Sequence, residues 1–128
     1  MNIDFLSLED VLQIHSIQLD RFGGGEGLRD IKLLESAIFQ PQSTFDGEYL
    51  HRSLFEIGAA YLFHIVKNHP FVDGNKRTGL GCCLVFLELN GIQINKGTAE
   101  LYDVTIKVAS SEYSKEKIAE KLYSLSCL

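Results

Sequence analysis

The chain has 128 residues, of which 45% are hydrophobic and 10% aromatic, and its formal net charge is −5. This composition can form a hydrophobic core without disulfide bonds, so it excludes a disordered chain and predicts one domain over residues 1–128. The acidic balance argues against direct nucleic-acid binding, because proteins of that class depend on a basic surface.

Membrane insertion and secretion are also disfavoured. The longest apolar run, residues 80–87, is much shorter than the ~20 residues that a membrane-spanning helix needs. The N-terminus lacks the basic region and the cleavage site of a signal peptide. Cys82 and Cys83 are adjacent and Cys127 stands apart, a pattern that predicts reduced thiols in a cytoplasmic protein without membrane contact.

Two helices are predicted in the first third of the chain. Ser7 can cap a helix together with Asp10, after which apolar residues recur at three- and four-residue spacing until Gly23. A second helix begins near Asp30 and ends before Pro41. The stretch that follows, residues 42–49, contains Asp-Gly turn chemistry and predicts a short β flap.

The rest of the chain has helical periodicity. Apolar spacing predicts a third helix from about Tyr49 to Asn68, and a fourth over about Asn75–Asn90 that is apolar on nearly all sides and therefore central. Two further helices are expected over residues 98–109 and 114–125. The fold class predicted is all-α, a bundle of about six helices with a short β-hairpin flap.

The most informative stretch is residues 69–79, His-Pro-Phe-Val-Asp-Gly-Asn-Lys-Arg-Thr-Gly, between the third and fourth helices. Gly74 allows a sharp turn, so the backbone N–H groups of Asn75, Lys76 and Arg77 begin a helix without acceptors. With the helix dipole and the two cationic side chains, these groups predict a binding site for an anion such as phosphate.

Two further side chains complete the chemistry. Asp73 is a hard oxygen ligand suited to Mg²⁺ shared with phosphates, and His69 can accept a proton from an attacking hydroxyl. A metal, a phosphate cradle and a base are the components of phosphoryl or nucleotidyl transfer. Each of these residues alone is more often structural; their joint placement at the start of a buried helix favours function.

These residues resemble the signature of the Fic/Doc superfamily, His-Pro-Phe-x-Asp-Gly-Asn-(Gly or Lys)-Arg, and are most similar to its Doc branch, which has Asn-Lys-Arg-Thr. The likeness extends to residues 27–30, 34–37 and 41–45, so it covers roughly residues 3–95. The last thirty residues carry no signature.

The resemblance implies the toxin of a bacterial toxin–antitoxin pair, a kinase that passes the γ-phosphoryl group of ATP to a hydroxyl of translation elongation factor Tu and so blocks translation. It implies that His69 is the general base and Asp73 the Mg²⁺ ligand. Three further sets follow from it: phosphate-binding Gly74, Asn75, Lys76 and Arg77; the core anchor Phe71; and a target-docking flap of Ser43, Thr44 and Phe45.

Two alternatives remain open, namely a Fic-like protein adenylyltransferase that transfers AMP and a catalytically idle partner of the antitoxin. Lys76 and Leu80 stand where Fic enzymes have a glycine and a second arginine, which favours the Doc-like kinase. The self-inhibitory pattern of many Fic proteins is missing, because residues 44–48 only approximate it and lie in the flap. A separate antitoxin, whose disordered tail folds on binding, is therefore expected.

Other polar residues are assigned structural roles. His64 is expected in or near the core, and His15 and His51 lack the spacing of a structural metal site. Cys82 and Cys83 should be packed, unreactive thiols. The Gly23–Gly25 run lacks the ending of a phosphate-binding loop and is interpreted as a flexible connection.

Overall fold

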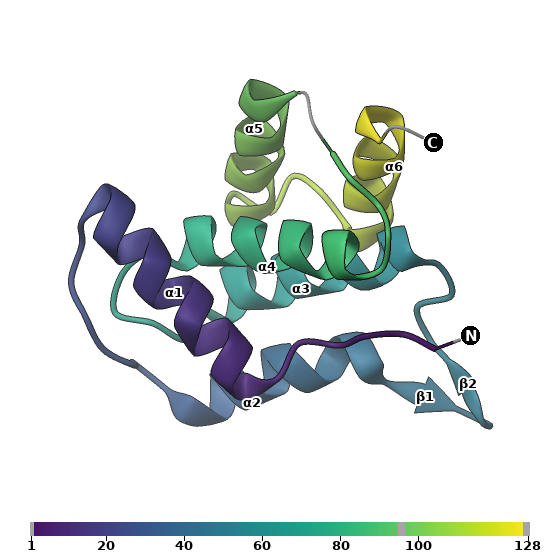
Figure 1. Cartoon of the computed structure of the whole chain (residues 1–128), viewed down its shortest axis with the longest axis horizontal. Helices are drawn as coiled ribbons and strands as arrows, with labels where there is room; N and C mark the ends of the chain where they lie inside the picture. The colour runs from purple at the N-terminus through teal and green to yellow at the C-terminus, as the bar shows by residue number, and fades with distance from the viewer. Residues whose placement is uncertain (1, 95–96, 127–128) are drawn as a thin grey trace.

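A computed structural model of the protein describes residues 2–94 and 97–126. This part of the chain folds into six α-helices and one small hairpin (Figure 1). Their order is α1 (Leu8–Phe22), α2 (Ile31–Phe39), a 3₁₀ turn (Gln40–Gln42), β1 (Thr44–Phe45), β2 (Glu48–Tyr49), α3 (Leu54–Asn68), α4 (Asn75–Leu89), α5 (Thr98–Ala109) and α6 (Lys115–Leu125). The predicted all-α bundle with a short β-hairpin flap is confirmed.

Local capping signals explain where three helices begin. The Ser7 hydroxyl accepts the N–H of Asp10 at 3.1 Å, and the Asp10 carboxylate accepts the N–H of Ser7 at 2.9 Å, which completes a capping box at α1. Asp30 and Ser114 cap α2 and α6 similarly, each accepting a backbone N–H from three residues further on. These starts agree with the sequence predictions.

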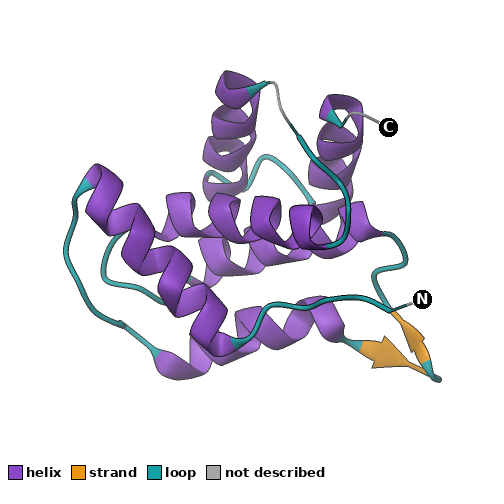
Figure 2. Ribbon diagram, viewed as in Figure 1, coloured by secondary structure: helices purple, strands orange, loops and turns teal. Residues whose placement is uncertain are grey.

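The start of the third helix was predicted too early. Tyr49 belongs to β2, where it pairs with Thr44, and α3 begins only after Ser53, whose hydroxyl caps it. Asp46 and Gly47 both have positive φ, as the tight turn between two hairpin strands requires. Tyr49 therefore pairs within the hairpin, although its apolar spacing alone is compatible with a helix. Figure 2 shows the two hairpin strands and the helices that flank them.

Helices α3 and α4 lie side by side at the centre of the bundle. Helix α1 packs on α4, α2 and α6 pack on α3, and α5 contacts both central helices. Buried apolar side chains from all six helices form one cluster, which confirms the predicted central position of α4. Cys82 and Cys83 are fully buried within it, and desolvation raises the pKa of both thiols, so they are unreactive packing groups as predicted. Cys127 lies outside the described residues.

Two loops position the residues of the sequence motif. The motif loop, residues 69–74, joins α3 to α4, and the α1–α2 loop, residues 23–30, runs beside it (Figure 1). Arg29 N–H donates to the Pro70 carbonyl at 2.7 Å, and Val72 N–H donates to the Gly27 carbonyl at 3.0 Å. The two loops are therefore joined by backbone hydrogen bonds. Within residues 2–94 and 97–126, no helix is both long and apolar enough to cross a membrane.

Candidate active site

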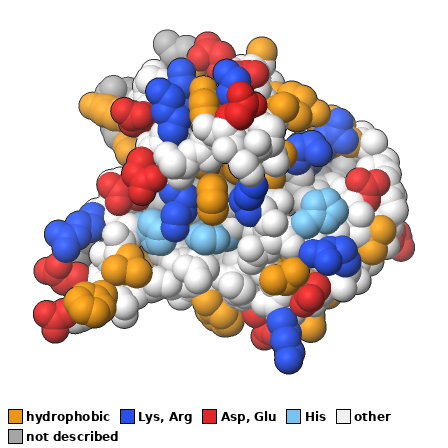
Figure 3. All heavy atoms as spheres, turned by 180° about the vertical axis from the view of Figure 1, so that it is seen from behind, with side chains coloured by type: hydrophobic (Ala, Val, Ile, Leu, Met, Phe, Trp, Pro, Cys, Tyr) orange, Lys and Arg blue, Asp and Glu red, His pale blue; other side chains and the backbone are white. Residues whose placement is uncertain are grey.

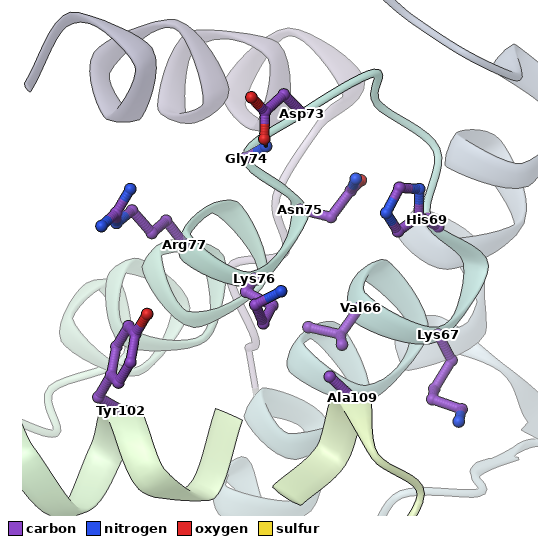
Figure 4. Close-up of a pocket in the computed structure, with 10 residues that line it drawn as sticks. All are labelled: Val66, Lys67, His69, Asp73, Gly74, Asn75, Lys76, Arg77, Tyr102 and Ala109. Atoms are coloured by element: carbon purple, nitrogen blue, oxygen red, sulfur yellow. Dashed lines mark hydrogen bonds between the residues drawn. The ribbon is translucent and has the colours of Figure 1, made fainter. Parts of the chain in front are cut away.

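A surface cavity of about 440 Å³ lies where the motif loop, the end of α3, the first turn of α4 and one face of α5 meet (Figure 4). Six of the seven residues that the sequence assigned to catalysis, metal binding, phosphate binding or loop anchoring line this cavity, and the seventh, Phe71, is buried beneath the loop. The complete lining is Val66, Lys67, His69, Asp73, Gly74, Asn75, Lys76, Arg77, Tyr102 and Ala109. On the face of the molecule opposite to that of Figure 1, histidine side chains lie near Lys and Arg side chains (Figure 3).

His69 ends helix α3 in a left-handed conformation, with φ 51° and ψ 54°. Its N–H still donates to the Ile65 carbonyl at 3.1 Å, so the helical hydrogen-bonding pattern continues up to this residue. The left-handed turn then directs the chain out of the helix and leaves the His69 side chain exposed at the cavity. A general base needs this access to a substrate hydroxyl.

Phe71 and Asn75 hold the motif loop in the core. Phe71 is 1% exposed, and its backbone N–H and carbonyl bond to the amide of Asn75 at 2.9 and 3.0 Å. The Asn75 side chain is buried and its amide is satisfied by these bonds, so toward the cavity the residue can offer its backbone N–H. Phe71 also stacks on His15, with ring centroids 3.7 Å apart, and His15 Nε2 donates to the Asp73 carbonyl at 2.9 Å.

The N-terminus of α4 is open to the cavity. Gly74 precedes it with φ 79° and provides no side-chain cap, so the first N–H groups of the helix are available to an anion. Lys76 and Arg77 are exposed in the same turn, and the Arg77 guanidinium stacks 4.2 Å above the ring of Phe22. This stacking fixes the guanidinium beside the helix terminus while leaving its edge accessible to a ligand.

Asp73 presents an ionised carboxylate at the cavity. One oxygen accepts the Gly74 N–H at 2.8 Å and the other accepts the Gly25 N–H at 3.2 Å. The bond from Gly25, followed by that from Gly74, lowers the pKa of Asp73, and the charge of Arg77 adds to this effect. The side chain is exposed, so lone pairs remain for a hard cation such as Mg²⁺. Among the described residues, no group of three His, Cys, Asp or Glu side chains could hold a metal. A cation at Asp73 would therefore also need oxygens from a bound substrate such as a phosphate.

The structure adds residues that sequence spacing did not identify. His15 supports Asp73 from α1, and Gly25 bonds its carboxylate from the α1–α2 loop, although the glycine run was interpreted as a simple connection. Arg29 donates to the His69 carbonyl, and Tyr102 lines the cavity from α5. Only Arg29 had a local signal, since it lies in the 27–30 segment that resembles the family.

The flap residues lie apart from this cavity. Thr44 and Phe45 are exposed in β1 and Ser43 is half-buried before it; none of these three described residues lines the cavity. Phe45 is 75% exposed, an unusual state for a large apolar side chain. The role of the flap in docking a target stays a prediction.

Comparison with known proteins points to one family. A family model described as the Fic/DOC family matches residues 5–87, which include the flap and the complete motif. The chain is 35% identical to the protein kinase doc of Escherichia phage P1 over 120 residues, which cover 94% of each chain. It is 36% identical to the toxin Doc of Mycolicibacterium smegmatis over 121 residues, covering 93% of this chain and 91% of the relative. With its motif arranged around one cavity and these matches along most of its length, the chain belongs to the Fic/Doc family.

Proposed function

We propose that this protein is a Doc-like toxin that transfers the γ-phosphoryl group of ATP to a hydroxyl of translation elongation factor Tu. The observation that carries the proposal is the cavity itself, where an exposed histidine, an ionised carboxylate and an open helix N-terminus with two cations meet. Both relatives named above carry names of this kind, one a protein kinase and the other a toxin.

In this proposal, His69 accepts the proton of the target hydroxyl while the hydroxyl oxygen forms a bond to the γ-phosphorus. The bond between the γ-phosphorus and the bridging oxygen breaks, and ADP leaves. The exposed position of His69 at the end of α3 supports its role as the base, because the target is a protein whose hydroxyl must reach the imidazole from outside.

The phosphates would lie at the start of α4. Backbone N–H groups of residues 75–77 can donate to phosphate oxygens, and Lys76 and Arg77 can neutralise the charge that develops during transfer. Asp73, ionised and accessible, is the side chain that fits Mg²⁺, which would supply further charge neutralisation at the phosphates when bound.

Two residues favour phosphoryl over AMP transfer. Lys76 adds a long cationic side chain at the cavity, where the Fic pattern has a glycine. Leu80 occupies the position of the second Fic arginine, and it packs partly buried against the hydrophobic core. The chain thus offers no charge at position 80 to hold the end of a nucleotide in the Fic orientation, where a charge-assisted hydrogen bond would contribute roughly 1.5–3 kcal/mol.

A cognate antitoxin completes the proposal. This sequence lacks the self-inhibitory pattern of many Fic proteins. We therefore assign inhibition to a second protein, whose disordered tail folds as it binds. The proposed target is a translation factor, which places the action of the toxin in the cytoplasm.

The test uses the purified protein with elongation factor Tu, Mg²⁺ and ATP labelled at either the α or the γ phosphate. We expect γ label on a serine or threonine of the factor and no α label. His69→Ala should lower the transfer rate by about 10²–10⁴-fold while keeping the melting temperature of the wild type, because the side chain is exposed. Stable α label on the factor would favour the adenylyltransferase alternative instead.

A further inference from the structure

The backbone of His69 is held in a conformation that it would not adopt by default. Its φ of 51° lies in the left-handed region, which is unfavourable for residues other than glycine. Such a conformation persists only where surrounding contacts stabilise it. If the peptide group after His69 rotated to a commoner conformation, the imidazole would leave its place at the cavity.

Arg29 makes contacts at this point. Its Nε donates to the His69 carbonyl at 2.7 Å and its Nη2 donates to the Asn68 carbonyl at 2.9 Å. Both oxygens lie at the C-terminus of α3, where helix carbonyls lack intrahelical donors and the dipole favours a cation. The planar guanidinium of Arg29 donates to both carbonyls from fixed positions, whereas the ammonium group of a lysine has no such planar pair of donors.

The main chain of Arg29 is itself fixed against the motif loop. Its N–H and that of Asp30 donate to the Pro70 carbonyl at 2.7 and 3.1 Å, and Leu28 forms a bridge with Phe71. Asp30 also caps α2 through its side chain. The backbone from which the guanidinium extends is therefore already ordered, so only the side chain of Arg29 loses freedom when it binds the two carbonyls.

We propose that Arg29 is a positioning residue that holds His69 in its catalytic orientation by bonding the backbone on both sides of the helix end. The inference rests on the proposed function, in which His69 is the base. Arg29 does not line the cavity, so it acts on the reaction through His69 and not through contact with a nucleotide. Its loss should lower kcat and leave ATP binding unchanged, because the phosphate-binding groups lie on α4.

The experiment compares wild type with Arg29→Ala, Arg29→Lys, His69→Ala and the double variant Arg29→Ala/His69→Ala. The readouts are kcat and KM for ATP in phosphoryl transfer to elongation factor Tu, with circular dichroism to confirm folding. Arg29→Ala should lower kcat about ten- to hundredfold, as expected for a misplaced catalytic group, with KM within about twofold of wild type. Arg29→Lys, which keeps one donor and the charge, should recover part of the loss.

The double variant separates positioning from general structural support. If Arg29 acts through His69, removing it from the His69→Ala protein changes the residual rate by less than about twofold, because effects of residues in one unit are not additive. Lys117→Ala is the matched control, since it removes one positive charge from the exposed side of α6 outside the cavity, and it should behave as wild type.

The outcomes are distinguishable from those that test the function. A His69→Ala protein with wild-type kcat would refute the proposed base, and the inference on Arg29 would fall with it. If His69→Ala is inactive while a folded Arg29→Ala keeps wild-type kcat, the proposed function stands and the positioning role is refuted. An equal further loss of rate in both backgrounds, or a raised KM for ATP in Arg29→Ala and Arg29→Lys, would also overturn it.

Discussion

Gly24 has no side chain, and the structure indicates that a methyl group there would displace the Asp73 carboxylate. A Cβ built on Gly24 would lie 2.9 Å from Asp73 Oδ2 and 3.1 Å from Leu19 Cδ2. Ordinary van der Waals contact begins at 3.4 Å, so the carboxylate must retreat by about half an ångström, and the contact with Leu19 is also tighter than ordinary. The Gly25 N–H bond to the same oxygen, already 3.2 Å long, would be broken.

We therefore expect Gly24→Ala to lower kcat/KM for transfer about ten- to hundredfold, the effect of misplacing an active-site group by up to 1 Å. The Gly25 bond is the largest cause that lowers the pKa of Asp73, so this pKa should rise toward its ordinary value in the variant. In acid, activity should then be lost at a higher pH than in wild type, because the carboxylate protonates sooner. Steady-state transfer of γ label across pH, at several Mg²⁺ concentrations, measures both effects.

Gly23→Ala is the matched control. Gly24 and Gly23 both have positive φ, at 125° and 78°, but nothing lies within 4 Å of the Cβ position of Gly23. Both variants should lose stability by about 1–3 kcal/mol from backbone strain. Only Gly24→Ala should lose activity in addition. Equal activities of the two variants would refute the argument that the placement of Asp73 depends on this glycine.

Three more measurements follow from buried or cavity-lining groups. The Thr78 hydroxyl is buried without a hydrogen-bond partner among the described residues, so Thr78→Val should raise the free energy of unfolding in urea by about 1 kcal/mol. Burial, then the neighbouring Lys115 and His51, lowers the pKa of His64 to about 4. Since the unfolded chain takes up this proton near pH 6.5, the free energy of unfolding should fall between pH 6.5 and 4, by roughly 2 kcal/mol after allowance for partial solvent access, and His64→Gln should reduce the fall. Tyr102, 46% exposed at the cavity, should bind the nucleoside by stacking, so Tyr102→Ala should raise the KM for ATP about two- to tenfold and Tyr102→Phe should not.

Local chemistry made most of the fold predictable. The helix starts at Ser7, Asp30 and Ser114 and the turn at residues 46–47 depend on neighbours within a few positions, and all four occur as expected. The predicted start of α3 was wrong because Tyr49 is compatible with either a helix face or a strand pair. Its pairing with Thr44 of the preceding strand places it in the hairpin. Periodicity alone does not include that competition.

The candidate site was predictable for a different reason and to a different extent. Residues 69–77 are consecutive, so their chemistry is visible in the sequence as one group. The groups that orient them come from far along the chain: Gly25 is 48 residues from Asp73, and His15 is 58 residues from it. Spacing rules describe neighbours on one helix or strand, so contacts of this range cannot be derived from them.

Hydrogen bonds to its backbone hold the motif loop, which explains how the loop can be both rigid and reactive. Arg29, the α1–α2 loop, Asn75 and His15 bond the backbone of five consecutive residues, 69–73. Among the described residues, no hydrogen bond or ion pair is found for the His69 imidazole or the Lys76 ammonium, which leaves both for a substrate. Because the hydrogen bonds fix the backbone, the loop needs less reorganisation during the reaction. The side chains that react are not occupied by these bonds. Substitutions of the residues that hold the motif loop should consequently change kcat, whereas substitutions of Lys76 and Arg77 should change the binding of ATP as well.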